Sequence, residues 1–172
     1  VITGGPSVGE QFSSLKLDHL LFIGSNRVAK KVATQAAKNL VPTTLELGGK
    51  SPTIIGTNAN MALAAERILF SKTLNAGQIC LSPDYIFVKK DEKRNLISEL
   101  QKAYSKFFPE PNSHNQTSMV NKHHLKRMNS YLLDATKKGA TVESLGKNDD
   151  LAKNMISTKI VTEVNDDMDV MK

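Results

Sequence analysis

The sequence predicts an α/β fold built from parallel βαβ units. Residues 18–23 form a continuous apolar run of strand length, apolar residues then recur at helical spacing up to Leu40, and residues 43–47 read as a second strand. A strand, a helix and a strand within about thirty residues match a βαβ crossover. A run that is apolar throughout is typical of a parallel strand buried on both faces.

The elements before and within this unit have identifiable boundaries. A turn at the start of the chain precedes an expected short helix over residues 7–15, and Pro42 ends the second helix because proline has no N–H to continue it. Gly24 and Ser25 then fall at the carboxyl end of a parallel strand, where such sheets bind ligands. Backbone N–H groups near Asn26 suit a phosphate or ribose. The alternative is a simple tight turn, since the Gly-x-Gly-x-x-Gly pattern is absent.

The remaining chain continues to alternate helices and strands. Gly77 and Gly139 are expected to end two of these helices, because glycine readily adopts the left-handed conformation of a helix terminus. The expected elements are an extended run at 53–55, helices at 61–75, 91–108 and 120–138, and strands at 85–88, 141–142 and 159–164.

Composition excludes several classes of function. The 172-residue chain carries a net charge of +6, but its lysines are spread along the sequence and only 5% of residues are aromatic. Nucleic-acid binding is therefore not expected, while an anionic ligand such as a dinucleotide suits a basic chain. No apolar run approaches the roughly 18 residues of a membrane span. The single cysteine favours a reducing compartment, the cytoplasm.

Cys80 is the candidate nucleophile, because a thiolate is strongly nucleophilic and this thiol follows a helix end. A packed structural thiol is the alternative, since free cysteine is often buried. Glu46 is a candidate general base if its strand faces a cleft, and a solvent-exposed residue otherwise. No metal site is expected: adjacent histidines His123 and His124 point in different directions on a helix, and no ligand cluster joins them.

Three motifs resemble the aldehyde dehydrogenase superfamily. Residues 45–52 (Leu-Glu-Leu-Gly-Gly-Lys-Ser-Pro) are similar to its glutamate motif, and residues 75–80 (Asn-Ala-Gly-Gln-Ile-Cys) to its cysteine motif. Residues 22–29 resemble its Phe-Thr-Gly-Ser-x-x-Val-Gly cofactor turn. Ser82-Pro83-Asp84-Tyr85 is similar to the class 3-like branch, which includes fatty aldehyde and coniferyl aldehyde dehydrogenases.

The resemblance implies an oxidoreductase that converts an aldehyde to a carboxylic acid with NAD or NADP. Cys80 would attack the aldehyde, and Glu46 would activate the water that hydrolyses the resulting thioester. A homo-oligomer, either a dimer or a tetramer, is also implied. The implied cofactor-binding residues are Gly24, Ser25, Asn26, Arg27, Val28, Ala29, Leu47 and Gly48.

The chain resembles a middle section of that family. Residues 1–47 correspond to the last part of a Rossmann-like dinucleotide-binding domain and residues 48–172 to the first part of the thiol-bearing catalytic domain. Ile23 and Ala29 replace the family's usual threonine and glycine, which alters the expected cofactor contact. The section alone is expected to be inactive or weakly active.

Two other functions remain open on sequence grounds. The first is a non-catalytic binding or scaffold protein with the same fold, in which Cys80 would be inert. The second is a cysteine hydrolase, although no histidine is placed as its base. Neither the particular aldehyde nor the choice between NAD and NADP follows from the sequence.

Overall fold

The computed structural model describes residues 1–109, 116–147 and 149–172. The chain divides into two compact units, Val1–Gly49 and Lys50–Lys172, and each is described by itself. This division lies two residues after the boundary expected from the sequence. The assignment of the two parts to a cofactor domain and a catalytic domain stays a prediction.

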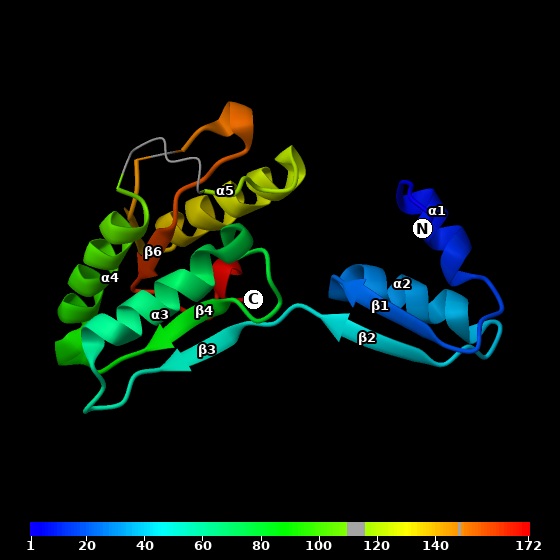
Figure 1. Cartoon of the computed structure of the whole chain (residues 1–172), viewed down its shortest axis with the longest axis horizontal. Helices are drawn as coiled ribbons and strands as arrows, with labels where there is room; N and C mark the ends of the chain where they lie inside the picture. Colours follow the sequence, from blue (N-terminus) through cyan, green and yellow to red (C-terminus); the bar gives the residue numbers. More distant parts are fainter. Residues whose placement is uncertain (110–115, 148) are drawn as a thin grey trace. The chain divides into compact units, whose positions relative to one another are not determined.

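The first unit is the expected βαβ crossover, preceded by a short helix. Helix α1 (Pro6–Ser13) comes first, followed by β1 (Leu20–Gly24), α2 (Asn26–Ala37) and β2 (Thr43–Leu47). The two strands pair in parallel, with Leu20 opposite Thr43 and continuous register to their ends (Figure 1). The parallel βαβ prediction is therefore confirmed here.

The core of this unit lies between α2 and one face of the sheet. Its buried members are Leu20, Val32, Ala36 and Val41. Leu21 and Ile23, in contrast, are 58% and 72% exposed. The expectation of a strand buried on both faces is thus wrong for the described chain, because α2 packs on one face and the other carries no second layer.

The second unit begins with another parallel strand pair. Strand β3 (Ser51–Ile54) leads through α3 (Met61–Thr73) to β4 (Pro83–Phe87), and α4 (Lys93–Phe107) follows. Helices α3 and α4 lie side by side (Figure 1). Asn60 caps α3 by accepting the N–H of Leu63 at 3.1 Å, which explains where that helix starts.

Apolar faces of α3 and α4 supply the main core. Its buried residues are Ala65, Ile68, Leu69, Leu96, Leu100, Ala103 and Tyr104. Leu69 is only 2% exposed, so truncation to alanine would cost about 2–5 kcal/mol of unfolding free energy. This core fixes the carboxyl end of α3, from which the cysteine segment departs.

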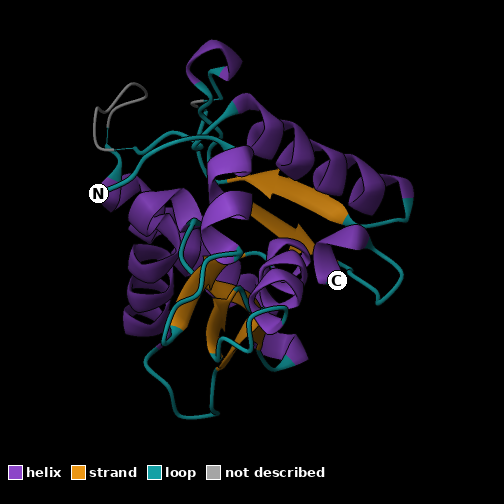
Figure 2. Ribbon diagram, turned by 90° about the vertical axis from the view of Figure 1, so that its right-hand side faces the viewer, coloured by secondary structure: helices purple, strands orange, loops and turns teal. Residues whose placement is uncertain are grey.

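The last part of the chain adds an antiparallel pair that the sequence did not predict. Helix α5 (Lys122–Lys137) precedes β5 (Thr141–Ser144), which pairs antiparallel with β6 (Lys159–Thr162). Figure 2 shows two strand arrows that point in opposite directions, as this pairing requires. Short one-turn helices complete the fold at Leu74–Gly77, Lys90–Glu92, Leu151–Lys153 and Asp169–Met171.

Candidate functional site

The carboxyl edge of the β1–β2 pair gathers several of the predicted site residues. In the parallel register Gly24 lies opposite Leu47, and Ile23 lies opposite Glu46. The cofactor turn and the glutamate motif are therefore neighbours, although they are separated by more than twenty positions in the sequence. Glu46 is exposed in the described structure.

The ring of Phe22 packs over Gly24. A Cβ atom there would lie 2.6 Å from the ring of Phe22, well inside contact distance. Ser25 then caps α2 by accepting the N–H of Val28 at 3.4 Å. The first N–H groups of this 12-residue helix open onto the strand edge, which is the arrangement that binds phosphate or ribose oxygens.

The other predicted cofactor residues differ in accessibility. Asn26 and Arg27 are exposed on the first turn of α2, and a Cβ on Gly48 would meet nothing within 4 Å. Ala29, however, is only 2% exposed. Its side chain packs inside the unit, so only its backbone is placed near the start of the helix.

Cys80 lies in a loop with unusual backbone geometry. Helix α3 stops at Thr73, and Asn75, Ala76 and Gly77 follow with φ of 50°, 55° and 73°. Left-handed geometry at a residue such as Ala76 costs about 1 kcal/mol. Such strain persists where surrounding contacts impose it and is frequent at functional sites. Cys80 itself is exposed among the described residues rather than packed in a core.

Gln78 supplies hydrogen bonds on both sides of this loop. Its side-chain Nε2 donates to the carbonyl oxygens of Asn75 at 2.9 Å and Ser118 at 3.3 Å. Its Oε1 accepts the N–H of Val120 at 2.9 Å. One amide group thus joins the cysteine loop to a segment forty residues later.

Charged side chains frame the base of the same loop. The carboxylate of Asp84 forms an ion pair with Lys50, and the Lys72 ammonium lies 4.0 Å from it. Burial lowers the pKa of Lys72 below that of an ordinary lysine; Asp84 opposes this shift and Lys50 adds to it. Lys50 also donates to the carbonyl oxygen of Val170. The two ion pairs connect the carboxyl end of α3 with the amino ends of β3 and β4.

The two sequence neighbours of Cys80 have aliphatic side chains. Ile79 and Leu81 flank Cys80 and are 40% and 80% exposed. Ser82 is 7% exposed, and its hydroxyl has no hydrogen-bond partner among the described residues. An accessible thiol next to exposed aliphatic side chains suits attack on a substrate with an apolar body.

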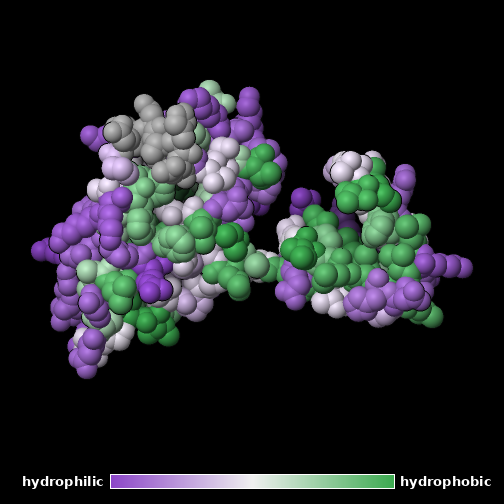
Figure 3. Space-filling view, in the orientation of Figure 1, coloured by the Kyte–Doolittle hydropathy of each residue, from purple (hydrophilic) through white to green (hydrophobic). Residues whose placement is uncertain are grey.

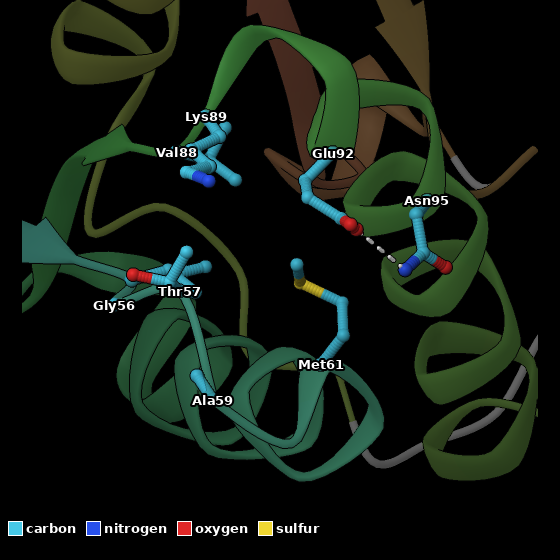
Figure 4. Close-up of a pocket in the computed structure, with 9 residues that line it drawn as sticks. Gly56, Thr57, Ala59, Met61, Val88, Lys89, Glu92 and Asn95 are labelled. Atoms are coloured by element: carbon cyan, nitrogen blue, oxygen red, sulfur yellow. Dashed lines mark hydrogen bonds between the residues drawn. The ribbon is translucent and has the colours of Figure 1, made fainter.

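A hollow of about 300 Å³ lies at the opposite edge of the β3–β4 pair. Figure 4 shows Met61 and Glu92 pointing into it, with Glu92 accepting a hydrogen bond from Asn95 at 2.9 Å. It is lined by the loops that follow the two strands, whereas Cys80 precedes β4. The hollow and Cys80 therefore lie at opposite edges of the β3–β4 pair.

The structure brings the predicted residues together in two sets. Gly24, Ser25, Glu46, Leu47 and Gly48 share one strand edge of the first unit, and Cys80 belongs to the second. Sequence reasoning did not assign roles to Gln78, Lys72 or Asp84. The only sequence signal for these residues was their position inside or beside the cysteine motif. Their roles depend on partners that are distant in the sequence, such as Ser118 and Val120 for Gln78 and Lys50 for Asp84.

Fold and residues together define a class of protein. It is an α/β protein in which Gly24 ends a parallel strand at the start of a helix, and in which an exposed thiol follows a loop with left-handed backbone geometry. The model of the aldehyde dehydrogenase family matches the whole chain, residues 1–172. The chain belongs to the aldehyde dehydrogenase family, which confirms the resemblance read from the three motifs.

Individual relatives agree with this family. A probable coniferyl aldehyde dehydrogenase of Caulobacter vibrioides is 44% identical over 177 residues, and the coniferyl aldehyde dehydrogenase of a Pseudomonas species is 39% identical over 178 residues. These alignments cover 100% and 99% of this chain but 36% of each relative. The chain thus spans about a third of the length of the curated relatives it matches.

Solved structures show the same fold. Substrate-bound AldH of Staphylococcus aureus superposes with a TM-score of 0.90 at 36% identity, covering 99% of this chain and 37% of that one. Betaine aldehyde dehydrogenase of the same species, solved with NAD+, gives 0.85 at 27% identity, with 99% and 36% covered. The predicted fold class is therefore confirmed. Among the described helices, none has both the length and the apolarity needed to cross a membrane.

Proposed function

We propose that this chain is the central section of an NAD- or NADP-dependent aldehyde dehydrogenase that converts aldehydes to carboxylic acids. The observation that carries the proposal is the exposed Cys80 thiol on a strained loop, in a chain whose whole length matches the family. Because the chain spans about a third of its relatives, the activity belongs to the full-length protein.

Cys80 acts as the nucleophile. Its thiolate adds to the aldehyde carbonyl and gives a thiohemiacetal, and loss of hydride from that carbon leaves a thioester on the cysteine sulfur. Water then attacks the thioester, releases the carboxylic acid and returns the thiol. Glu46 accepts the proton of that water, and it also assists removal of the thiol proton. The backbone N–H of Cys80 is one donor to the oxyanion that develops.

The first unit fits a dinucleotide at its strand edge. Glycine at position 48 leaves room for close approach, and the capped start of α2 presents N–H donors to phosphate or ribose oxygens. When bound there, the nicotinamide cofactor supplies the hydride acceptor. The residues that would hold it are Gly24, Ser25, Asn26, Arg27, Val28, Ala29, Leu47 and Gly48.

Aldehydes with an apolar body are the proposed substrates. Exposed Ile79 and Leu81 flank the thiol, and two relatives carry the name coniferyl aldehyde dehydrogenase. Burying one such aliphatic side chain against substrate contributes about 1.5–3 kcal/mol. Aromatic aldehydes of the coniferyl type are therefore the first substrates to test. A cytoplasmic location and assembly as a dimer or tetramer stay predictions.

Removal of the thiol tests the proposal. The full-length protein is mixed with coniferyl aldehyde and NAD or NADP, and the absorbance of the reduced cofactor is followed. Cys80→Ala should abolish the signal, because the substituted residue has no nucleophile. Ser82→Ala is the matched control, since it removes a neighbouring hydroxyl and keeps the thiol.

Two results would contradict the proposal that the full-length protein is an enzyme with Cys80 as its nucleophile. One is the same rate with Cys80→Ala as with the unmodified protein. The other is a Cys80 that iodoacetamide does not alkylate in the folded protein, which would support the scaffold alternative instead.

A further inference from the structure

The side chain of Gln78 is the one group that ties the cysteine loop to another part of the described second unit by several hydrogen bonds at once. Its Nε2 donates within the loop to Asn75 and across to Ser118, and its Oε1 accepts from Val120. Asn75 returns a hydrogen bond from its Nδ2 to the carbonyl oxygen of Gln78 at 3.2 Å. The atoms that the Gln78 side chain contacts in Asn75, Ser118 and Val120 are all backbone atoms, so the link does not depend on a second side chain.

The segment that receives these bonds is itself fixed. Met119 is only 7% exposed, and its N–H donates to the carbonyl oxygen of Asn154 at 2.8 Å. Asn154 has a left-handed backbone with φ of 56°. The loop is therefore connected through Gln78 to residues 118–120, and through Met119 to the turn before β6.

The loop needs such an attachment. Three successive residues, Asn75 to Gly77, have positive φ, and Ile79, Cys80 and Leu81 are exposed and contribute little burial energy. Strained, poorly buried segments relax unless neighbouring contacts over-determine their geometry. Gln78 lies two residues before the thiol, between the strained turn and the nucleophile.

We propose that Gln78 is a positioning residue that fixes the Cys80 loop by clamping it to the backbone of residues 118–120. This inference rests on the proposed role of Cys80 as nucleophile and extends it to the group that holds the thiol in place. Gln78 does not touch the reacting atoms; it acts through the loop. Displacement of a reacting group by about 1 Å can lower a rate by about a hundredfold.

The test compares Gln78→Met, which keeps the length of the side chain and removes its donors and acceptor, with Gln101→Met on the exposed face of α4. In the full-length protein, Gln78→Met should lower kcat about tenfold to a hundredfold and leave KM for aldehyde within about twofold. Gln101→Met should change neither constant.

A second variant separates positioning from general loss of structure. Gln78→Glu keeps an acceptor for Val120, but its carboxylate repels the two carbonyl oxygens that Nε2 contacts. A protonated carboxyl again donates one hydrogen bond. The ratio of its kcat to that of the unmodified protein at the same pH should therefore rise as pH falls toward the ordinary carboxyl pKa of about 4.3. A flat ratio would overturn the inference.

Amide hydrogen exchange tests the link between the Cys80 loop and residues 118–120 without measuring activity. In Gln78→Met the N–H of Val120 and the loop amides should exchange about fivefold faster, because one hydrogen bond within the loop and two to residues 118–120 are lost. Unchanged exchange, or unchanged kcat with faster exchange, would overturn the inference. If the unmodified protein oxidised no aldehyde, the proposed function would fail, while faster exchange would still support the clamp.

Discussion

The two edges of the β3–β4 pair differ in shape and in chemistry. The carboxyl edge has a hollow of about 300 Å³, and its Glu92 is paired with Asn95. The amino edge carries an open loop with three left-handed residues, an exposed thiol and an ion-pair cluster. Parallel sheets usually bind ligands at their carboxyl edge. The cofactor site proposed at the β1–β2 pair would follow that rule, whereas Cys80 lies at the amino edge of the β3–β4 pair.

If Cys80 is the nucleophile, as proposed, the hollow at the carboxyl edge does not mark the site of its chemistry. Backbone strain, exposure of a nucleophile and hydrogen bonds between distant segments mark the amino edge. Figure 3 shows hydrophobic residues at the surface of both units, and Ile54 and Phe87 of the β3–β4 pair are 76% and 57% exposed. Exposed apolar surface is therefore not specific to the site either.

The largest further effect is expected at Glu46. Glu46→Gln removes the carboxylate base but keeps the size of the side chain, so thioester hydrolysis should slow and kcat should fall about 10²–10⁴-fold. Stopped-flow absorbance should still show one burst of reduced cofactor for each Cys80. Glu10→Gln, on the exposed surface of α1, is the matched control. Full turnover in Glu46→Gln would exclude Glu46 as the base.

A smaller effect is expected from Gly77→Ala, which disturbs the loop without touching the thiol. Its φ of 73° disfavours a side chain, and a Cβ would lie 3.1 Å from the carbonyl oxygen of Lys72. The variant should lose about 1 kcal/mol of unfolding free energy and about tenfold in kcat. Urea unfolding and steady-state kinetics measure the two effects.

Gly139→Ala is the control for that experiment. Gly139 has a φ of 97°, but a Cβ there meets nothing within 4 Å and the residue lies outside the loop. Similar loss of stability with unchanged kcat is expected. Equal loss of kcat in both variants would assign the effect of Gly77→Ala to stability rather than to the loop.

The smallest effect is expected at the hollow. Glu92→Gln removes a charge from its wall and keeps a hydrogen-bonding partner for Asn95. Both kcat and the KM values for aldehyde and cofactor should stay within about twofold of the unmodified protein, because the hollow is on the other edge of the strands. A larger change in either KM would indicate that a ligand binds in the hollow, and the carboxyl edge of the β3–β4 pair would then be part of the site.

The sequence predicted most of the elements because their signals are local. Asn60 and Gly139 mark helix boundaries through their own backbone chemistry, and the elements of both βαβ units follow from apolar periodicity. The expectation that Pro42 ends the second helix is wrong, because α2 already ends at Ala37 and Leu40 has a left-handed φ of 56°. Helix α3 ends two residues earlier than expected, because Leu74 already leaves helical geometry. The antiparallel β5–β6 pair was missed because strand direction depends on contacts that periodicity does not encode.

The site was only partly predictable for the same reason. Cys80, Glu46, Gly24 and Ser25 stood out through residue type and motif, and the register of β1 and β2 makes the last three neighbours. Gln78 belongs to the cysteine motif, but its hydrogen bonds to Ser118 and Val120 depend on tertiary packing. Roles that depend on distant backbone atoms do not show in a local pattern.

The clamp at Gln78 also has a consequence for the order of synthesis. A ribosome releases the thiol-bearing loop well before Ser118 and Val120, and Met119 in turn waits for Asn154. During that interval Cys80 is present without the backbone atoms that the Gln78 side chain contacts. On the proposed role of Gln78, the Cys80 loop can reach its final geometry only after the chain up to Asn154 has been synthesised.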